Sequence, residues 1–299
     1  IVACLVGSEM CIRDRDMVAY QKRNLIDIKS PNPSVETFLH AFLPFKFVDH
    51  THSDAIMDVT NRANGKDLCK KIFGSKVSIV PYVMPGFSLA QKINEVYDKN
   101  PNINCLILLN HGIFTFDNDA KKSYDLMIKY VSIAEKTIKK LKRKKIKQIK
   151  NYNTKFEPHE IAPILRGLLS ENHNQKFILN YRSNKNLNYF INGKDVKRYS
   201  SIGTATPDHV IRVKPFPLVI TPKQNSSIED FKKIAEKSFK DYRKKYVKYF
   251  NTNKKKVKGK KTMLDTSPRV IMVQNVGLFS VGSSLNAVSY THLRAHETS

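Results

Sequence analysis

Three histidines have the residue type and spacing of a metal-binding set. His50 and His52 are two residues apart in the run FKFVDHTH (45–52), which predicts a strand, so both imidazoles should project from the same face. A second apolar run, residues 103–109, leads directly into Asn110-His111-Gly112. Strand ends are where α/β sheets present ligand-binding residues. Three imidazoles without a fourth protein ligand are typical of a catalytic zinc ion with an open position.

The competing interpretation is that these are ordinary histidines, which a lone His-x-His pair would favour. The third histidine, after a second buried strand, shifts the interpretation toward a metal. His40 lies four residues after Glu36, hence on the same helical face, and we interpret it as a packing or supporting residue. His159 and His173 are interpreted as loop residues, and spacing gives no role for His209.

The surrounding pattern predicts alternating strands and helices, and therefore a layered α/β fold. Ser34 is positioned to cap a short helix with Glu36 in its first turn, and residues 117–119 offer caps for a long helix beginning near Ala120. Strands are predicted at 45–52, 77–84 and 103–109, and helices at 53–64 and 88–97. Beyond residue 155 we expect a shorter unit with a helix at 161–169, strands at 177–181 and 210–219, a helix at 231–250 and a hairpin at 269–279, without a visible internal repeat.

Four successive segments resemble the motifs of the class II aldolase and adducin superfamily. They are PSVETFLHAF (33–42), VDHTHSDA (48–55), VPYVMPGFSLA (80–90) and LLNHGIFTFDNDA (108–120). The resemblance implies a three-layer α/β/α domain over residues 16–150 and a smaller α+β extension over 151–287. Residues 200–220 and 265–282 resemble a narrower group, the bifunctional rhamnulose-1-phosphate aldolase and short-chain dehydrogenase proteins. No dinucleotide fingerprint is present, so the dehydrogenase half is expected after Gly282.

The resemblance also implies roles for individual residues. His50, His52 and His111 would hold a zinc ion, Glu36 would be the catalytic acid/base, and Ser34 would contact the substrate phosphate unless it is simply a helix cap. The expected reaction is cleavage of a ketose 1-phosphate, L-rhamnulose 1-phosphate first of all, into dihydroxyacetone phosphate and L-lactaldehyde. A homo-oligomer is expected, because family sites are completed across subunits.

Two other functions stay open at this point. A sugar-phosphate epimerase or dehydratase of the same superfamily would share the metal, and an adducin-like binding module would lack catalysis. The three histidines together with Glu36 argue against the binding module, which has no need of them.

Composition excludes several classes of partner. The formal net charge of +26 comes largely from lysines in residues 136–155 and 232–261, and the first of these runs has no aromatic residues interleaved as stacking platforms for bases. We therefore expect no nucleic acid partner. Cys69 and Cys105 form no Cys-x-x-Cys pattern, which favours a reducing cytoplasm. Apolar runs fall far short of the roughly 20 residues of a membrane helix, so no membrane association is expected.

Both ends of the chain resemble translated cloning sequence. VSYTHLRAHET (288–298) is encoded by DNA resembling a transposase sequencing adapter, and residues 4–15 correspond to its reverse complement. We expect residues 1–15 and 288–299 to be adapter-derived and the remaining sequence to be truncated. The family's glycine-rich phosphate-binding turn, which normally precedes the glutamate, would then be lost and the fragment could be inactive.

Overall fold

The computed structural model divides the chain into two compact units, Ile1–Lys142 and Arg143–Ser299. The structure describes residues 14–34, 36–141, 145–150, 154, 156–171, 176–204, 209, 213–255 and 261–289. The segments expected to be adapter-derived, 1–15 and 288–299, fall largely outside these ranges.

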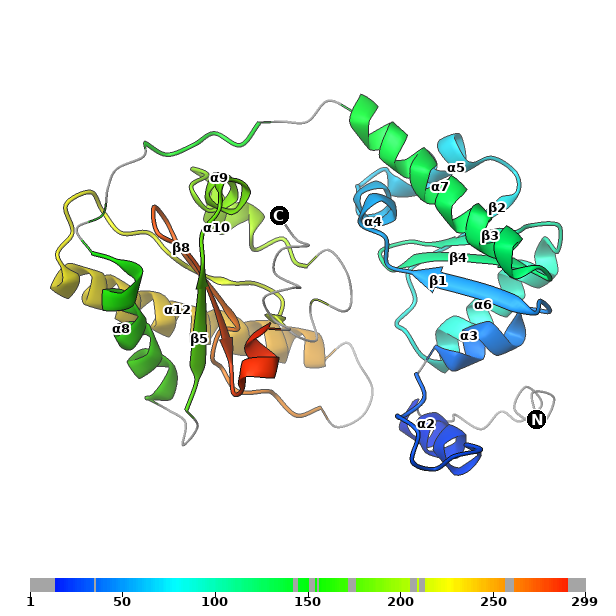
Figure 1. The fold of residues 1–299 in the computed structure, drawn as a ribbon, viewed down its shortest axis with the longest axis horizontal. Helices are drawn as coiled ribbons and strands as arrows, with labels where there is room; N and C mark the ends of the chain where they lie inside the picture. Colours follow the sequence, from blue (N-terminus) through cyan, green and yellow to red (C-terminus); the bar gives the residue numbers. More distant parts are fainter. Residues whose placement is uncertain are drawn as a thin grey trace. The chain divides into compact units, whose positions relative to one another are not determined.

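The first unit is built on a four-stranded sheet with the order β1-β4-β3-β2 (Figure 1). Strand β2 runs parallel to β3, whereas β4 is antiparallel to both β3 and β1. In the register of β1 and β4, His50 lies opposite Phe114. The strands are β1 (Phe47–Thr51), β2 (Val77–Val80), β3 (Cys105–Leu108) and β4 (Gly112–Asp117). Strand β4 was not predicted as a separate element, although it lies between β1, which carries His50, and β3, which precedes His111.

Helices cover both faces of this sheet, which confirms the α/β/α layering. Side chains alternate between the faces along each strand, so Phe114 and Phe116 pack with α3 and α6, while Ile107 and Ile113 pack with α4, α5 and α7. Met17 of α2 joins the first of these two cores. The helices are α2 (Asp14–Arg23), α3 (Thr37–Phe42), α4 (Asp54–Thr60), α5 (Gly65–Phe73), α6 (Phe87–Lys99) and α7 (Ala120–Lys140).

One helix start agrees with the sequence prediction, and two other helix boundaries differ from it. Asp119 caps α7 through a 2.9 Å hydrogen bond from the Lys122 amide, as predicted. The helix predicted at 53–64 ends at Thr60, and α5, which was not predicted, begins at Gly65. Glu36 occupies the residue before α3 rather than its first turn, and its amide donates to the Ser34 hydroxyl at 3.1 Å.

The second unit has a four-stranded sheet of its own, with the order β5-β8-β7-β6. Helices α8 and α12 pack on one face and α9 and α10 on the other, so this unit, predicted as an α+β extension, also combines a sheet with helices. The strands are β5 (Ile178–Arg182), β6 (Leu218–Ile220), β7 (Val270–Val273) and β8 (Gly277–Gly282). The helices are α8 (Pro158–Ser170), α9 (Lys185–Ile191), α10 (Val196–Tyr199) and α12 (Ile228–Lys254).

None of the helices in the described part of the chain combines the length and the apolar composition that crossing a membrane requires. Cys69 and Cys105 are both free and buried in the core beneath α5 and α7. Burial raises the pKa of each thiol, which makes both poor nucleophiles at neutral pH.

Candidate metal centre

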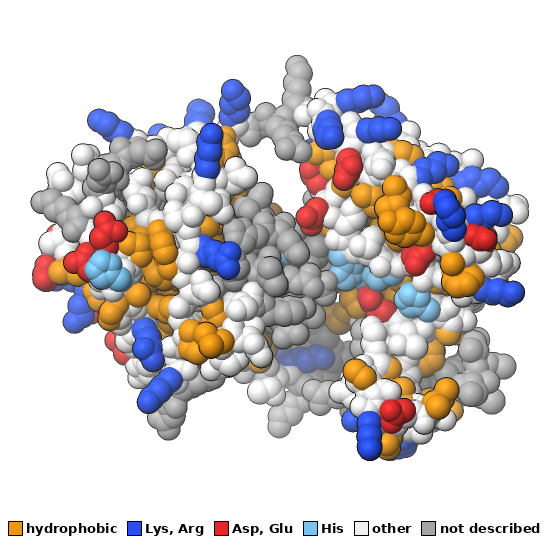
Figure 2. Space-filling model, in the orientation of Figure 1, with side chains coloured by type: hydrophobic (Ala, Val, Ile, Leu, Met, Phe, Trp, Pro, Cys, Tyr) orange, Lys and Arg blue, Asp and Glu red, His pale blue; other side chains and the backbone are white. Residues whose placement is uncertain are grey.

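One end of the first sheet brings together the four residues that the sequence and the family resemblance singled out. His50 lies on β1, His52 directly follows it, His111 lies in the turn between β3 and β4, and Glu36 precedes α3. One potential ligand atom from each of the four lies within 4.8 Å of the others. The cluster therefore has the donor set of a metal centre. Histidine side chains are visible on the face of this unit that Figure 2 shows.

The turn that carries His111 depends on the residues on either side of it. Asn110 adopts a left-handed conformation with φ of 58°, which asparagine tolerates better than most residues. A Cβ atom on Gly112 would lie 2.6 Å from the Thr51 carbonyl oxygen and 3.0 Å from the rings of both His50 and His52. Only glycine allows β4 to approach β1 this closely, and this approach brings His111 beside the other two imidazoles.

His50 is held from two sides. Its Nδ1 lies 2.9 Å from the Ile113 carbonyl oxygen, which can only accept, so Nδ1 carries the hydrogen and Nε2 keeps a free lone pair. Its ring stacks on Phe114, with centroids 3.9 Å apart. Burial lowers the pKa of His50 to about 4, although Glu36 acts in the opposite direction. The imidazole is therefore neutral at pH 7, which is the form that binds metals.

Glu36 faces two of the imidazoles. Its Oε1 lies 2.8 Å from His111 Nε2, and its Oε2 lies 3.6 Å from His50 Nε2. Burial raises the pKa of Glu36, but the contacts with His111 and His50 lower it by more, so the pKa lies below the ordinary value of 4.5. Glu36 is therefore a carboxylate at neutral pH.

The arrangement fits a tetrahedral ion. Two nitrogens bound to zinc at 2.0 to 2.1 Å are roughly 3.3 Å apart, and Nε2 of His50 lies 3.0 Å from Nε2 of His52. The three ring centroids are 4.8, 4.9 and 5.3 Å apart. His111 is only 1% exposed, and its buried Nδ1 has no hydrogen-bond partner among the described residues. A divalent metal would satisfy this concentration of imidazole lone pairs.

The other residues considered from the sequence lie outside the cluster. His40 contacts the Val48 carbonyl oxygen at 3.1 Å and packs against the Phe114 ring, in keeping with a supporting position. Ser34 is exposed and its hydroxyl accepts the Glu36 amide. His159 is exposed in the first turn of α8 rather than in a loop, and His209 is fully buried in the second unit. His173 lies outside the described residues.

Phe114 is the supporting residue that sequence reasoning missed. It is fully buried, stacks on His50 and packs against His40. The alternation in GIFTFD (112–117), read as a strand, would have revealed its orientation.

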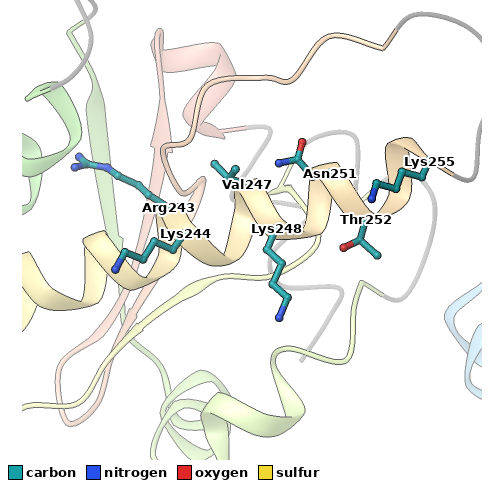
Figure 3. A pocket seen from close by; sticks show the side chains of 7 residues that line it. All are labelled: Arg243, Lys244, Val247, Lys248, Asn251, Thr252 and Lys255. Atoms are coloured by element: carbon teal, nitrogen blue, oxygen red, sulfur yellow. The ribbon is translucent and has the colours of Figure 1, made fainter.

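A groove of about 610 Å³ lies along α12 in the second unit (Figure 3). Its lining is basic and polar apart from Val247, and contains no histidine, cysteine or carboxylate: Arg243, Lys244, Val247, Lys248, Asn251, Thr252 and Lys255. It has neither metal ligands nor a carboxylate for proton transfer, so the histidine cluster remains the candidate site.

Comparison with known protein families agrees with this geometry. Residues 8–138 match the Class II Aldolase and Adducin N-terminal domain, and residues 155–292 match the family described as Aldolase class II, second domain. The chain carries class II aldolase/adducin superfamily domains. The cluster of Glu36 and the three histidines lies in the first of them.

Two individual proteins are similar to the chain. It is 33% identical over 281 residues to the uncharacterized oxidoreductase YuxG of Bacillus subtilis (strain 168), covering 91% of this chain and 40% of that protein. The chain thus spans about two fifths of the length of this curated relative. It also matches the solved structure of the N-terminal class II aldolase domain of a conserved protein from Thermoplasma acidophilum, at 42% identity and a TM-score of 0.41, covering 46% of this chain and 62% of that one.

Proposed function

We propose that this chain is the aldolase part of a zinc-dependent class II aldolase that cleaves a ketose 1-phosphate. The single observation that supports this most directly is the convergence of His50, His52 and His111 with Glu36 in a domain of the class II aldolase/adducin superfamily. The preferred substrate in this proposal is L-rhamnulose 1-phosphate, and the products are dihydroxyacetone phosphate and L-lactaldehyde.

The chemistry of the site suits carbon–carbon bond cleavage next to a ketone. In this reaction the C4 hydroxyl loses its proton and becomes the aldehyde carbonyl as the C3–C4 bond breaks. The electron pair of that bond stays on C3, and C3 must then receive a proton. A zinc ion held by the three histidines would polarise the substrate oxygens and stabilise the negative charge that develops. Glu36, 2.8 Å from His111, supplies a carboxylate beside that position for the proton transfer.

Supporting contacts keep these groups in place. The Ile113 carbonyl fixes the tautomer of His50, and Phe114 fixes the plane of its ring. The Ser34 hydroxyl, exposed near Glu36, is proposed to contact the phosphate of the substrate. Because this hydroxyl already accepts the Glu36 amide, it would also couple phosphate binding to the position of the carboxylate.

The oxidoreductase name of the Bacillus relative suggests how the intact protein is organised. This chain covers 40% of that protein, and both units of this chain match aldolase families. We propose that a short-chain dehydrogenase domain accounts for the oxidoreductase name and follows this chain in the intact protein, where it would oxidise or reduce the aldehyde product. We further propose a cytoplasmic homo-oligomer for the intact enzyme.

Glu36→Gln in the full-length protein tests the proposal. The substitution keeps the size of the side chain but removes the proton acceptor, so turnover should fall by roughly 10² to 10⁴-fold, the usual contribution of a general base. Solvent exchange of the C3 proton of dihydroxyacetone phosphate should fall with it, and zinc content should stay near one per chain.

Glu95→Gln is the control, because Glu95 is exposed on α6 and pairs there with Lys92 at 2.8 Å. It should leave exchange and turnover unchanged. Wild-type exchange in Glu36→Gln would contradict the assignment of Glu36 as the acid/base. Failure to cleave any of a panel of ketose 1-phosphates would contradict the aldolase itself.

A further inference from the structure

The two units share more than their layering. In both sheets the first strand lies at one edge, and the fourth strand pairs antiparallel with it and with the third. The second strand lies at the other edge, parallel to the third. In both units the helix before the first strand and the helix between the parallel strands pack on the same sheet face. Strands β1, β2, β3 and β4 thus correspond to β5, β6, β7 and β8.

Hydrogen bonds fix the correspondence residue by residue. In the first unit, His111 donates its amide to Leu108 at 3.2 Å, and Leu109 donates to Val80 at 3.0 Å. In the second unit, the same two bonds join Val276 to Val273 at 3.1 Å and Gln274 to Ile220 at 3.1 Å. Val276 therefore occupies the position of His111.

The turn geometry agrees with this alignment. Asn110 and Asn275 have φ angles of 58° and 60°, and each is followed two residues later by a glycine. A Cβ on Gly112 would lie 2.6 Å from the Thr51 carbonyl oxygen, and a Cβ on Gly277 would lie 2.6 Å from that of Arg182. The same close approach of edge strand and turn occurs in both units.

The edge strands then align without ambiguity. His50 lies opposite Phe114 and stacks on it, and Tyr181 lies opposite Phe279 and packs on it with ring centroids 5.1 Å apart. Two residues beyond the end of each edge strand, a helix-capping residue begins the next helix, Ser53 for α4 and Asn184 for α9. Tyr181 therefore replaces His50, and Ser183 replaces His52.

We infer that the second unit is a structural repeat of the first in which Tyr181, Ser183 and Val276 replace the three histidines, so that each chain takes one metal ion. The Tyr181 hydroxyl donates at 2.8 Å to the carbonyl oxygen of Val276, the residue in the place of His111. Among the described residues, no second cluster of metal-ligating side chains forms. This inference rests on the proposed metal site of the first unit for its count of ions.

Grafting the histidines tests the correspondence. The full chain is prepared as wild type, as His50→Ala/His52→Ala, as Tyr181→His/Ser183→His/Val276→His, and as the combination of all five changes. Zinc per chain is measured after equilibration and dialysis, and visible absorption of Co²⁺ reports tetrahedral coordination. We expect about one ion, none, two and one, respectively.

A register control accompanies the graft. Asn180→His/Arg182→His/Val276→His carries as many new histidines, but moves the pair by one residue and so to the opposite face of β5. It should bind no additional ion. Circular dichroism and thermal unfolding establish that each variant is folded.

The outcomes separate this inference from the proposed function. A folded graft without an additional ion, or a register control that binds as well as the graft, would overturn the correspondence while leaving the first site intact. Wild type without zinc, together with one ion in the five-fold variant, would overturn the metal function but support the repeat. If the graft does not fold, zinc remaining in His50→Ala/His52→Ala would by itself overturn the count of one ion per chain.

Discussion

The edges of the two sheets have closely matched backbones and different side chains. At each edge an asparagine with positive φ, a closely packed glycine and an aromatic residue on the neighbouring strand recur at corresponding positions. Where the first unit has His50, His52 and His111, the second has tyrosine, serine and valine. The recurring residues are those that the turn and the sheet require, whereas the differing residues are those that chemistry requires. The fold of a unit is thus a poor guide to whether its site can act.

Removing one imidazole should produce the largest difference between the two units in zinc retention and turnover. His52→Ala should abolish zinc retention and reduce turnover of the full-length enzyme to background, because two remaining imidazoles do not complete a catalytic zinc site. Ser183→Ala, at the corresponding position of the second unit, should change neither. Metal analysis and aldolase assays on the two purified variants make the comparison. Unchanged zinc in His52→Ala would show that the cluster is not the metal site.

The two glycines should respond alike in stability and differently in function. Gly112→Ala and Gly277→Ala each place a methyl group 2.6 Å from a backbone oxygen, and overpacking of this kind costs typically about 1 to 3 kcal/mol. Gly277 also has a φ of 150°, which adds strain to its variant. The new methyl at position 112 also meets the rings of His50 and His52 at 3.0 Å, so this variant should lose zinc affinity as well.

Denaturant unfolding and zinc titration of the two variants measure these effects. Gly277→Ala is expected to keep one ion per chain. If both glycine variants lost zinc equally, the metal would depend on the second unit, and the comparison of the two edges would fail.

Much of the first site could be predicted from the sequence because the residues that flank its histidines have the composition of strands. The run around His50 and His52 has the composition of a strand, and Asn110-His111-Gly112 directly follows a continuous apolar run, so both locations were expected. Glu36 came from the family resemblance alone, since nothing in its spacing shows that α3 packs against β1 and β4. Phe114 was missed because GIFTFD was not read as a strand.

The repeat escaped sequence reasoning for a different reason. The segments NHGIFTF (110–116) and NVGLFSV (275–281) share only the asparagine, the glycine and one phenylalanine, and the edge strands share still less. Apolar residues exchange freely within a core that keeps its volume and pattern, so hydrophobic positions preserve little identity. Pairing across strands, which a single sequence does not display, was needed to align His50 with Tyr181.

Lowering the pH should destabilise the two units over different pH ranges, which is the smallest of the expected differences between them. In the metal-free chain the pKa of His50 is about 4, against 6.5 for an ordinary histidine. Between these values the unfolded chain binds more protons, so the free energy of unfolding of the first unit decreases as the pH falls, by at most about 3 kcal/mol. In the second unit, burial opposes ionisation of Asp265, but Arg269 and Lys214 hold its pKa at about 2, against 3.8. Its stabilisation, at most about 2 kcal/mol, is lost only as the pH falls through that lower range.

Hydrogen exchange resolved by peptide should therefore show β1 and β4 losing protection between about pH 6.5 and 4, before β5 and β8 do. Saturating zinc should delay the loss in the first unit alone, because protons and metal compete for the same imidazole nitrogens. Earlier loss of protection in β5 and β8, or an equal effect of zinc on both sheets, would contradict the assignment of the metal and the titrating histidine to the first unit.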